Sequence, residues 1–326
     1  MAGGLDEFAR IDRFFKPLSR GFTGALGLED DAGLIAAPAG EALAVTTDAM
    51  VEGVHYPAGE DPARLARKLL RVNLSDLAAM GARPLAYTLT TALPAGVTED
   101  WLAAFAAGLE EDQGRYGIHL LGGDSVSTPG PAMLSVTAFG SVREARALRR
   151  AGALVGDDVF VSGSVGDAAL GLLAVRGELD GLAAPARAAL AGRYRLPEPR
   201  GALGPRLIGL AHAAVDLSDG LVGDLGHICA ASGVAARIEA ARVPLSDAGR
   251  AAVAADPALL PVALAGGDDY ELAFTAPPSA ADALGALATD LDLPLTRIGT
   301  IGAGGGVTVV DSDGQTLTLP VGWRHF

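Results

Sequence analysis

Residues 42–51 have the sequence ALAVTTDAMV, a run of apolar and β-branched residues interrupted by one carboxylate, Asp48. Such a run predicts a buried strand that presents the carboxylate near its end. Asp61 and Pro62 then begin a long apolar stretch that we expect to be helical as far as Met80, because Asp is a favoured N-cap and Pro a favoured first helical residue. A strand followed by a helix therefore organises this part of the chain.

Alternating strand and helix patterns continue along the sequence. A length of 326 residues exceeds what one hydrophobic core usually fills, so two domains are expected. We place the boundary near Arg150, which gives domains of residues 1–148 and 149–326, and we expect an α/β or α+β fold. The pattern predicts further strands at 85–92, 118–121, 133–142, 159–162, 213–215, 236–239, 270–275 and 307–310, and helices at 99–116, from 167 onward, after a turn at 196–200, and at 221–232.

The composition excludes several classes of protein. A formal charge of −14 makes nucleic acid an improbable partner, because phosphate binding needs clustered Lys and Arg. No run approaches the roughly 18 apolar residues of a membrane span, and the N-terminus lacks an export-signal pattern, so we expect a cytoplasmic protein. Cys229 is the only cysteine, which excludes an intrachain disulfide and a Cys-based zinc cluster. With two lysines, a bound polyphosphate would need arginine or divalent metal.

Six short acidic segments stand at the edges of the apolar runs. Mg²⁺ prefers oxygen ligands and binds through a few carboxylates and substrate phosphates, while neighbouring glycines let backbone N–H groups approach a phosphate. If these segments converge on one cleft, they suit a metal–nucleotide site. They are Glu29-Asp30-Asp31, Thr46-Thr47-Asp48, Asn73-Leu-Ser-Asp76, Gly122-Gly123-Asp124, Asp216-Leu-Ser-Asp219 and Gly266-Gly267-Asp268-Asp269.

Each of these aspartates taken alone is explained equally well as a helix cap or a turn residue. The set is harder to explain in that way. Asp48 follows apolar strand residues, Asp76 lies inside a largely apolar helix, and Asp216 follows an apolar strand, and an unpaired charge is costly at all three places. A shared metal would account for them. The chain has no G-x-x-x-x-G-K-[ST] motif, which disfavours a P-loop nucleoside triphosphatase.

Three other residues each keep two explanations at this stage. His55 is either an ordinary histidine or a group near the proposed site. Arg150 is either a surface residue or a phosphate clamp. Trp323 either fills a core or stacks on an aromatic ligand.

Taken together, the motifs resemble the thiamine-monophosphate kinase family, which belongs to the superfamily of aminoimidazole ribonucleotide synthetase. The resemblance implies a two-domain synthetase-like fold: an N-terminal domain whose sheet forms a barrel-like interface in a homodimer, and a C-terminal α/β domain. It runs from Gly27-Leu-Glu-Asp-Asp31 to Gly322-Trp-Arg-His-Phe326. Its most specific parts are Thr46-Thr-Asp48, Val72-Asn-Leu-Ser-Asp-Leu-Ala-Ala-Met-Gly-Ala82, Gly122-Gly-Asp124, Val215-Asp-Leu-Ser-Asp-Gly-Leu221 and Gly266-Gly-Asp-Asp-Tyr-Glu-Leu272.

The resemblance also implies a reaction and a set of residues. Members of the family transfer the γ-phosphoryl group of ATP in line to thiamine phosphate, with several Mg²⁺ ions and no catalytic protein nucleophile. Acceptor contacts fall on His55, Asp268 and Trp323, and Asp268 stands where relatives often carry Glu. Nucleotide contacts fall on Gly123, Asp124, Arg150 and Ser218. Metal ligands fall on Asp31, Thr46, Thr47, Asp48, Asp76, Asp124, Asp216 and Asp219.

Other classes of function stay open at the level of sequence. A sibling synthetase would share the fold and make aminoimidazole ribonucleotide, selenophosphate or a carbamoyl-derived maturation product. The N-terminal Cys or selenocysteine of selenophosphate synthetases and the Cys-containing tail of the maturation proteins are absent from this sequence. A two-metal phosphohydrolase also uses clustered Asp. A non-catalytic cation-binding protein is the third alternative.

Overall fold

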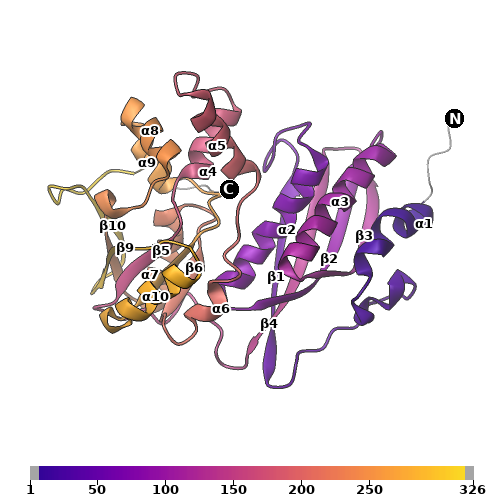
Figure 1. Ribbon diagram of the computed structural model, residues 1–326, viewed down its shortest axis with the longest axis horizontal. Helices are drawn as coiled ribbons and strands as arrows, with labels where there is room; N and C mark the ends of the chain where they lie inside the picture. The colour runs from indigo at the N-terminus through magenta and orange to yellow at the C-terminus, as the bar shows by residue number, and fades with distance from the viewer. Residues whose placement is uncertain (1–6, 320–326) are drawn as a thin grey trace. The chain divides into compact units, whose positions relative to one another are not determined.

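The computed structural model describes residues 7–319, and the chain divides into two compact units. The first comprises residues up to Leu77 together with Ala82–Ala145, and the second comprises Ala78–Gly81 together with the chain from Arg146 onward. Figure 1 shows a sheet and covering helices in each unit. The boundary predicted between residues 148 and 149 stays a prediction.

The first unit is built on a four-stranded sheet in the order β1-β4-β2-β3. Its strands are β1 (Glu41–Val51), β2 (Arg83–Pro94), β3 (His119–Thr128) and β4 (Met133–Arg143). The pairs β1–β4 and β4–β2 are antiparallel, and β2–β3 is parallel. Helices α2 (Pro62–Ala79) and α3 (Glu99–Tyr116) lie along one face of the sheet (Figure 1). The strands β2 and β4 accordingly alternate buried with half-buried residues.

The prediction of a buried strand at residues 42–51 was right about the strand and wrong about its burial. Along β1, Met50 is buried and the other residues are half-buried or exposed, with 58% of Val45 exposed. The reason is its position at an edge of the sheet, where it pairs with β4 on one side and, within residues 7–319, with no strand on the other. Apolar composition alone does not distinguish this strand from a central one.

Local signals for α2 are confirmed. The Asp61 carboxylate accepts a hydrogen bond from the backbone N–H of Arg64 at 2.8 Å, as an N-cap does. Gly81 follows the helix with a φ of 69°, which favours glycine. A buried ion pair joins α2 to α3: the Arg71 guanidinium binds both oxygens of Asp112, at 2.7 and 3.0 Å. This bidentate pair fixes the two helices relative to each other.

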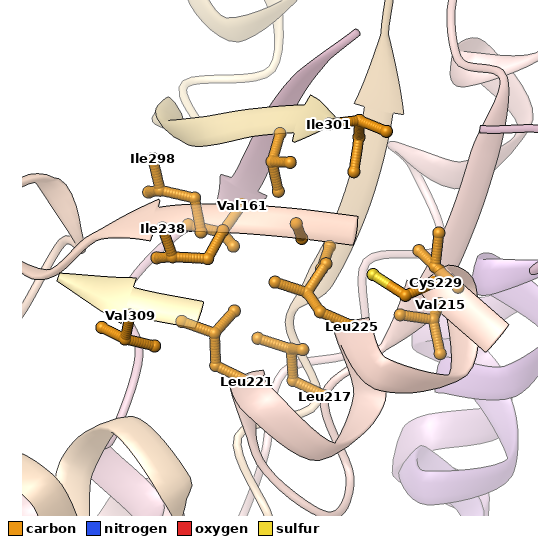
Figure 2. Packing of buried hydrophobic residues seen from close by; sticks show 14 of the residues in the cluster. Val161, Val215, Leu217, Leu221, Leu225, Cys229, Ile238, Ile298, Ile301 and Val309 are labelled. Atoms are coloured by element: carbon orange, nitrogen blue, oxygen red, sulfur yellow. The ribbon is translucent and has the colours of Figure 1, made fainter. Parts of the chain in front are cut away.

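The second unit contains a six-stranded sheet in the order β10-β7-β9-β5-β8-β6. The pair β10–β7 is parallel and the other pairs are antiparallel. Successive residues of a strand enter two different cores: Val159 and Val161 belong to one, and Phe160 to the other. Figure 2 shows the first core, where α7 (Leu221–Ser232) packs its Leu and Ile side chains against the strands. Both faces of this sheet are therefore covered.

The expected mixture of strands and helices is confirmed, although the strand ends and several elements differ. The strand predicted at 118–121 runs on to Thr128, and the helix predicted after residues 196–200 is the single-turn α6. The strand β9 and the helices α5, α8, α9 and α10 were not predicted. The remaining strands are β5 Asp158–Ser162, β6 Ala213–Asp216, β7 Ala235–Glu239, β8 Leu272–Ala276, β9 Leu295–Gly302 and β10 Gly306–Val310. The remaining helices are α1 Glu7–Arg10, α4 Asp167–Val175, α5 Ala184–Arg195, α6 Gly204–Leu207, α8 Asp247–Ala255, α9 Leu259–Ala265 and α10 Ala281–Asp290. Short 3₁₀ or π turns lie at Ile11–Phe15, Lys16–Ser19, Thr23–Leu28, Ala240–Arg242 and Pro278–Ala280.

Within residues 7–319, no helix has both the length and the apolar character required to cross a bilayer.

Candidate functional site

The first unit brings three of the predicted metal ligands together where β1 meets α2. Thr46 and Asp48 lie on the same face of β1, because side chains alternate along a strand, and Asp76 projects from α2. The Thr46 hydroxyl donates a hydrogen bond to an oxygen of Asp76 at 2.5 Å. Burial, together with the neighbouring Asp76 carboxylate, raises the pKa of Asp48 to about 7. The carboxylates of Asp48 and Asp76 and the hydroxyl of Thr46 therefore lie close together in a partly buried site.

The side chain of Thr47 lies on the opposite face of β1. Its hydroxyl donates to the carbonyl of Val136 at 3.2 Å and accepts from the hydroxyl of Thr137 at 3.1 Å. Thr47 and Thr137 are directly opposed across the β1–β4 ladder. The structure therefore does not bring the Thr47 hydroxyl to Asp48 and Asp76.

Asp124 stands apart from Asp48 in the single chain. It lies on β3, at the other edge of the sheet from β1, which places the two strands roughly 14 Å apart at three strand spacings. Asp124 and Ser127 help line a hollow of about 630 Å³ in the first unit, together with Arg10 and Phe15. The adjacent Gly123 packs on β2, since a Cβ there would lie 2.0 Å from the carbonyl oxygen of Leu89.

Two further predicted residues lie in loops of the first unit. Asp31 is exposed in the segment that precedes β1. His55 follows β1 in a tight turn, in which its backbone N–H donates to the carbonyl of Val51 at 2.9 Å. The Nδ1 atom of His55 accepts from the backbone N–H of Val51 at 3.0 Å, so the neutral ring carries its proton on Nε2. The turn thereby fixes the direction of the ring.

The second unit brings four predicted residues together on two adjoining turns. Asp216 ends β6 and begins the turn that leads through Ser218 and Asp219 into α7. The backbone N–H of Asp268 donates to the carbonyl of Ser218 at 2.8 Å. Two more backbone bonds, from Tyr270 to the carbonyl of Leu217 and from Leu217 to the carbonyl of Glu271, continue the pairing at 2.9 and 2.8 Å. The predicted metal, nucleotide and acceptor residues of this unit therefore share one hydrogen-bonded pair of segments.

Asp224 and His227 are near this turn and were not predicted. Asp224 is buried in the first turns of α7, and its carboxylate accepts from the backbone N–H groups of Asp219 and Gly220, both at 3.0 Å. Potential ligand atoms of Asp219, Asp224 and His227 lie within 4.8 Å of one another. The spacing of three residues from 224 to 227, which places both on one helix face, is the sequence signal that could have found them.

Electrostatics at Asp224 work in two directions. The pKa of Asp224 is raised to about 7 in the balance of all effects: burial is the largest cause, and the Asp219 carboxylate acts in the same direction. The two backbone N–H bonds lower it, as does the charge of Arg150. Arg150 is exposed, and its carbonyl accepts from the Ser232 hydroxyl at 3.1 Å. The predicted phosphate clamp is thus within electrostatic range of the turn that carries Asp219.

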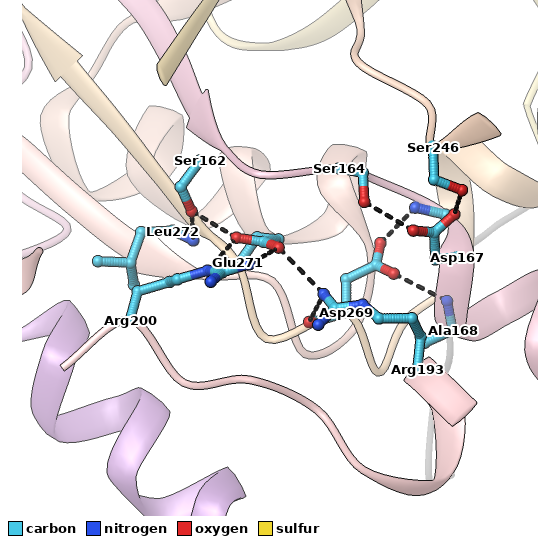
Figure 3. Close-up of polar contacts among 11 residues, drawn as sticks. Ser162, Ser164, Asp167, Ala168, Arg193, Arg200, Ser246, Asp269, Glu271 and Leu272 are labelled. Carbon is cyan, nitrogen blue, oxygen red and sulfur yellow. Dashed lines mark hydrogen bonds and ion pairs between the residues drawn. The ribbon is translucent and has the colours of Figure 1, made fainter. Parts of the chain in front are cut away.

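Two buried carboxylates beside Asp268 were also missed. Asp269 accepts from the backbone N–H groups of Gly166 and Ala168, at 2.5 and 3.0 Å, at the start of α4 (Figure 3). Burial raises the pKa of Asp269 to about 8, against the effect of those bonds. Glu271 is fully buried among Ser162, Arg193 and Arg200. Both residues belong to the motif Gly266-Gly-Asp-Asp-Tyr-Glu-Leu272, in which Asp268 alone has a predicted role.

Two groups of residues have oxygen donors that suit a hard divalent cation. They are Thr46, Asp48 and Asp76 in the first unit, and Asp216 and Asp219 in the second. Carboxylate and hydroxyl oxygens are the ligands that Mg²⁺ prefers. Burial and the neighbouring Asp76 carboxylate raise the pKa of Asp48, so a cation bound beside it would favour its ionised form. Trp323, the third predicted acceptor contact, lies outside the described residues.

The two units, each with its own acidic turns, define a two-domain protein of the AIR synthase related class. Residues 29–142 match the N-terminal domain of AIR synthase related proteins, and residues 155–312 match the C-terminal domain.

Full-length relatives narrow the class to one family. The thiamine-monophosphate kinase of Escherichia coli strain K12 is 42% identical over 322 residues, 98% of each chain, and that of Caulobacter vibrioides is 41% identical over 98% of this chain and 90% of its own. The crystal structure of thiamine-monophosphate kinase from Stenotrophomonas maltophilia K279a matches with a TM-score of 0.84 and 47% identity over 96% of this chain and 98% of that one. A further structure, AaThiL complexed with AMPPCP and TMP, matches at 31% identity with a TM-score of 0.79, over 98% and 97%. The chain belongs to the thiamine-monophosphate kinase family.

Proposed function

We propose that this protein transfers the γ-phosphoryl group of ATP to thiamine phosphate and produces thiamine diphosphate and ADP. The observation that carries the proposal is the backbone pairing of the Asp268 segment with the Asp216–Asp219 turn. It joins the residue proposed to contact the acceptor to residues proposed to bind metal and nucleotide. The family membership supports the same reaction, since the relatives at 41–42% identity are named for it.

The oxygen donors of each unit would hold Mg²⁺. In the first unit these are Thr46, Asp48 and Asp76, and in the second Asp216 and Asp219. Bound Mg²⁺ would neutralise the charge that develops on phosphoryl oxygens. The predicted contributions of Asp31, Thr47 and Asp124 stay predictions.

The protein's own part in the reaction is binding, orientation and charge. A terminal phosphate oxygen of the acceptor attacks the γ-phosphorus in line, a new P–O bond forms, and the bond from that phosphorus to the β-bridging oxygen breaks to release ADP. The attacking phosphate is already ionised, so no side chain has to remove a proton from it. Arg150 and the backbone of Gly123 would contact the nucleotide, while His55 and Asp268 would orient the acceptor.

The direct test is an acceptor assay. With ATP and Mg²⁺, we expect ADP and thiamine diphosphate to form in equal amounts when thiamine phosphate is added, and EDTA to stop the reaction. Product analysis by chromatography measures both. A γ-phosphate made chiral with oxygen isotopes should show inversion at phosphorus, because one in-line transfer inverts it.

The same assay separates the rival functions. Phosphate release that does not depend on thiamine phosphate would favour a metal-dependent phosphohydrolase. Activity only with another acceptor would favour a sibling synthetase. The full-length relatives at 41–42% sequence identity are named thiamine-monophosphate kinases, which argues against that class. If ATP and Mg²⁺ failed to raise the melting temperature, a non-nucleotide function would be favoured.

A homodimer and a cytoplasmic location also remain predictions. The face of the first unit's sheet that carries Val45 and Thr47 is not covered by α2 or α3, which supports the predicted barrel-like interface with a second copy. Light scattering of the purified protein would test the oligomeric state.

A further inference from the structure

The segment from Asp268 to Glu271 alternates between two environments. Asp269 and Glu271 are buried, with 2% and 0% of their surface exposed, whereas Asp268 and Tyr270 are half-buried. Successive side chains of the segment therefore point in different directions. The buried pair faces the interior of the second unit, and the half-buried pair is available to the candidate site.

The buried carboxylates of Asp269 and Glu271 anchor the segment to the interior of the second unit. Asp269 binds the backbone at the start of α4, at Gly166 and Ala168. Glu271 accepts from the Ser162 hydroxyl and the Arg200 Nε atom, both at 2.6 Å, as Figure 3 shows. These partners are 101 to 103 residues from Asp269 and 71 to 109 residues from Glu271 along the chain. The segment is thus held by elements distant in sequence.

Close backbone packing leaves the segment little freedom to move. A Cβ at Gly267 would lie 2.1 Å from the carbonyl oxygen of Ser218. A Cβ at Gly163 would lie 2.2 Å from Oε1 of Glu271. Glycine at both positions lets the segment seat against its neighbours.

Asp268 and Tyr270 both adopt left-handed backbone conformations, with φ values of 71° and 52°. Asp tolerates this region better than most residues, whereas for Tyr it is uncommon and costs free energy. Such conformations persist where surrounding contacts enforce them, and they cluster at ligand-binding sites. With both residues in this conformation, the Tyr270 hydroxyl lies 3.2 Å from Oδ1 of Asp268 and donates a hydrogen bond to it.

We propose that Tyr270 is a positioning residue, whose hydroxyl holds the Asp268 carboxylate in the orientation that binds the acceptor. The inference rests on the proposed role of Asp268 as an acceptor contact. Thiamine phosphate carries an amino group on its pyrimidine ring and a cationic thiazolium, and a carboxylate can accept from the first or pair with the second. A carboxylate held in one rotamer binds such a group with less loss of conformational freedom.

The test is a double-mutant cycle with Tyr270→Phe and Asp268→Asn. Tyr270→Phe removes one hydroxyl, and we expect the KM for thiamine phosphate to rise about five- to tenfold, the typical loss for one hydrogen bond. The KM for ATP and kcat should stay within about twofold, because the change weakens acceptor binding in ground and transition states alike. In the Asp268→Asn background, Tyr270→Phe should raise the KM no further, since the carboxylate it positions is gone.

Tyr87→Phe is the matched control. It also removes a tyrosine hydroxyl, which donates to Gln113 at 2.8 Å in the buried core of the first unit. This variant should lose stability but keep the wild-type KM for thiamine phosphate. Melting temperatures of all variants, and calorimetric binding of thiamine phosphate with a non-hydrolysable ATP analogue, separate folding from acceptor binding.

Each contrary outcome identifies what fails. If Asp268→Asn raises the KM and Tyr270→Phe does not, the positioning role is overturned while the kinase assignment stands. If Tyr270→Phe raises the KM equally in both backgrounds, Tyr270 contacts the acceptor itself and the inference is again overturned. If Asp268→Asn has no effect on an enzyme that phosphorylates thiamine phosphate, the role of Asp268 and the inference both fail. A wild-type protein inactive on thiamine phosphate would overturn the proposed function and the inference with it.

Discussion

Glu271→Gln should lower the free energy of unfolding by about 3–5 kcal/mol, because it removes the charge that balances two arginines in a buried ion-pair network. Glu271 is fully buried, and Arg193 and Arg200 both pair with it while exposing only 24% and 16% of their side chains. The amide keeps the shape of the side chain but removes the negative charge with which both guanidinium groups pair. Urea unfolding at pH 7 measures the change.

Glu239→Gln is the control for that experiment. Glu239 also pairs with an arginine, Arg242, at 2.7 Å, but the pair is three residues apart and exposed. Exposed pairs contribute about 0–1 kcal/mol, so this variant should unfold almost as the wild type does. Equal losses in the two variants would show that the Glu271 network does not stabilise the fold in the way we infer.

The fold was predictable to the extent that its signals are local. The cap at Asp61, the apolar repeat of α2 and the glycine after it are read within a few residues, and the structure confirms them. Burial of β1 was not predictable in this way, because it depends on the position of the strand in the sheet. The strand β9 was missed for a related reason: its sequence LTRIGTIG alternates weakly and contains two glycines, and its pairing partners are distant in the chain.

The motifs named several predicted site residues that lie close together, but they gave no indication of the residues that hold them in place. Asp48 and Asp76 do lie together, as do Ser218 and Asp268. That the Thr47 side chain turns away from Asp48 could have been read from the sequence alone, because side chains alternate along a strand. The anchoring role of Asp269 was beyond local reasoning, because its hydrogen-bond partners lie 101 and 103 residues earlier.

Asp48→Asn should reduce activity and, in metal-free buffer, increase stability. The proposed role of Asp48 as a Mg²⁺ ligand predicts a loss of about 100- to 1000-fold in kcat/KM, the size expected when one group that stabilises transition-state charge is removed. The gain in stability has a separate cause. Asp48 is partly buried beside Asp76, and these neighbours disfavour its charge. A neutral amide of the same shape relieves that unfavourable charge.

The pH dependence gives this prediction its sign. The folded protein raises the pKa of Asp48 to about 7, whereas the unfolded side chain titrates near 3.9. Between these values the folded state binds more protons, so the contribution of Asp48 to stability is present at low pH and is lost as pH rises to about 7. With EDTA, Asp48→Asn should therefore match the wild type near pH 4 and exceed it by about 1–3 kcal/mol at pH 8.

Comparison of the two proteins isolates Asp48, because Asp224 and Asp269 also have raised pKa values and are unchanged in the variant. Adding Mg²⁺ at pH 8 should stabilise the wild type more than Asp48→Asn, since a cation that binds the folded state stabilises it by mass action. Urea unfolding of both proteins at pH 4 and pH 8, with EDTA and with Mg²⁺, measures the free energies of unfolding that these expectations compare. An active Asp48→Asn that is less stable than the wild type at pH 8 would mean that Asp48 supports the fold and not the site. Burial and Asp76 disfavour the charge of Asp48, whereas cation binding requires it. Substitution of such a carboxylate should therefore lower activity and raise stability.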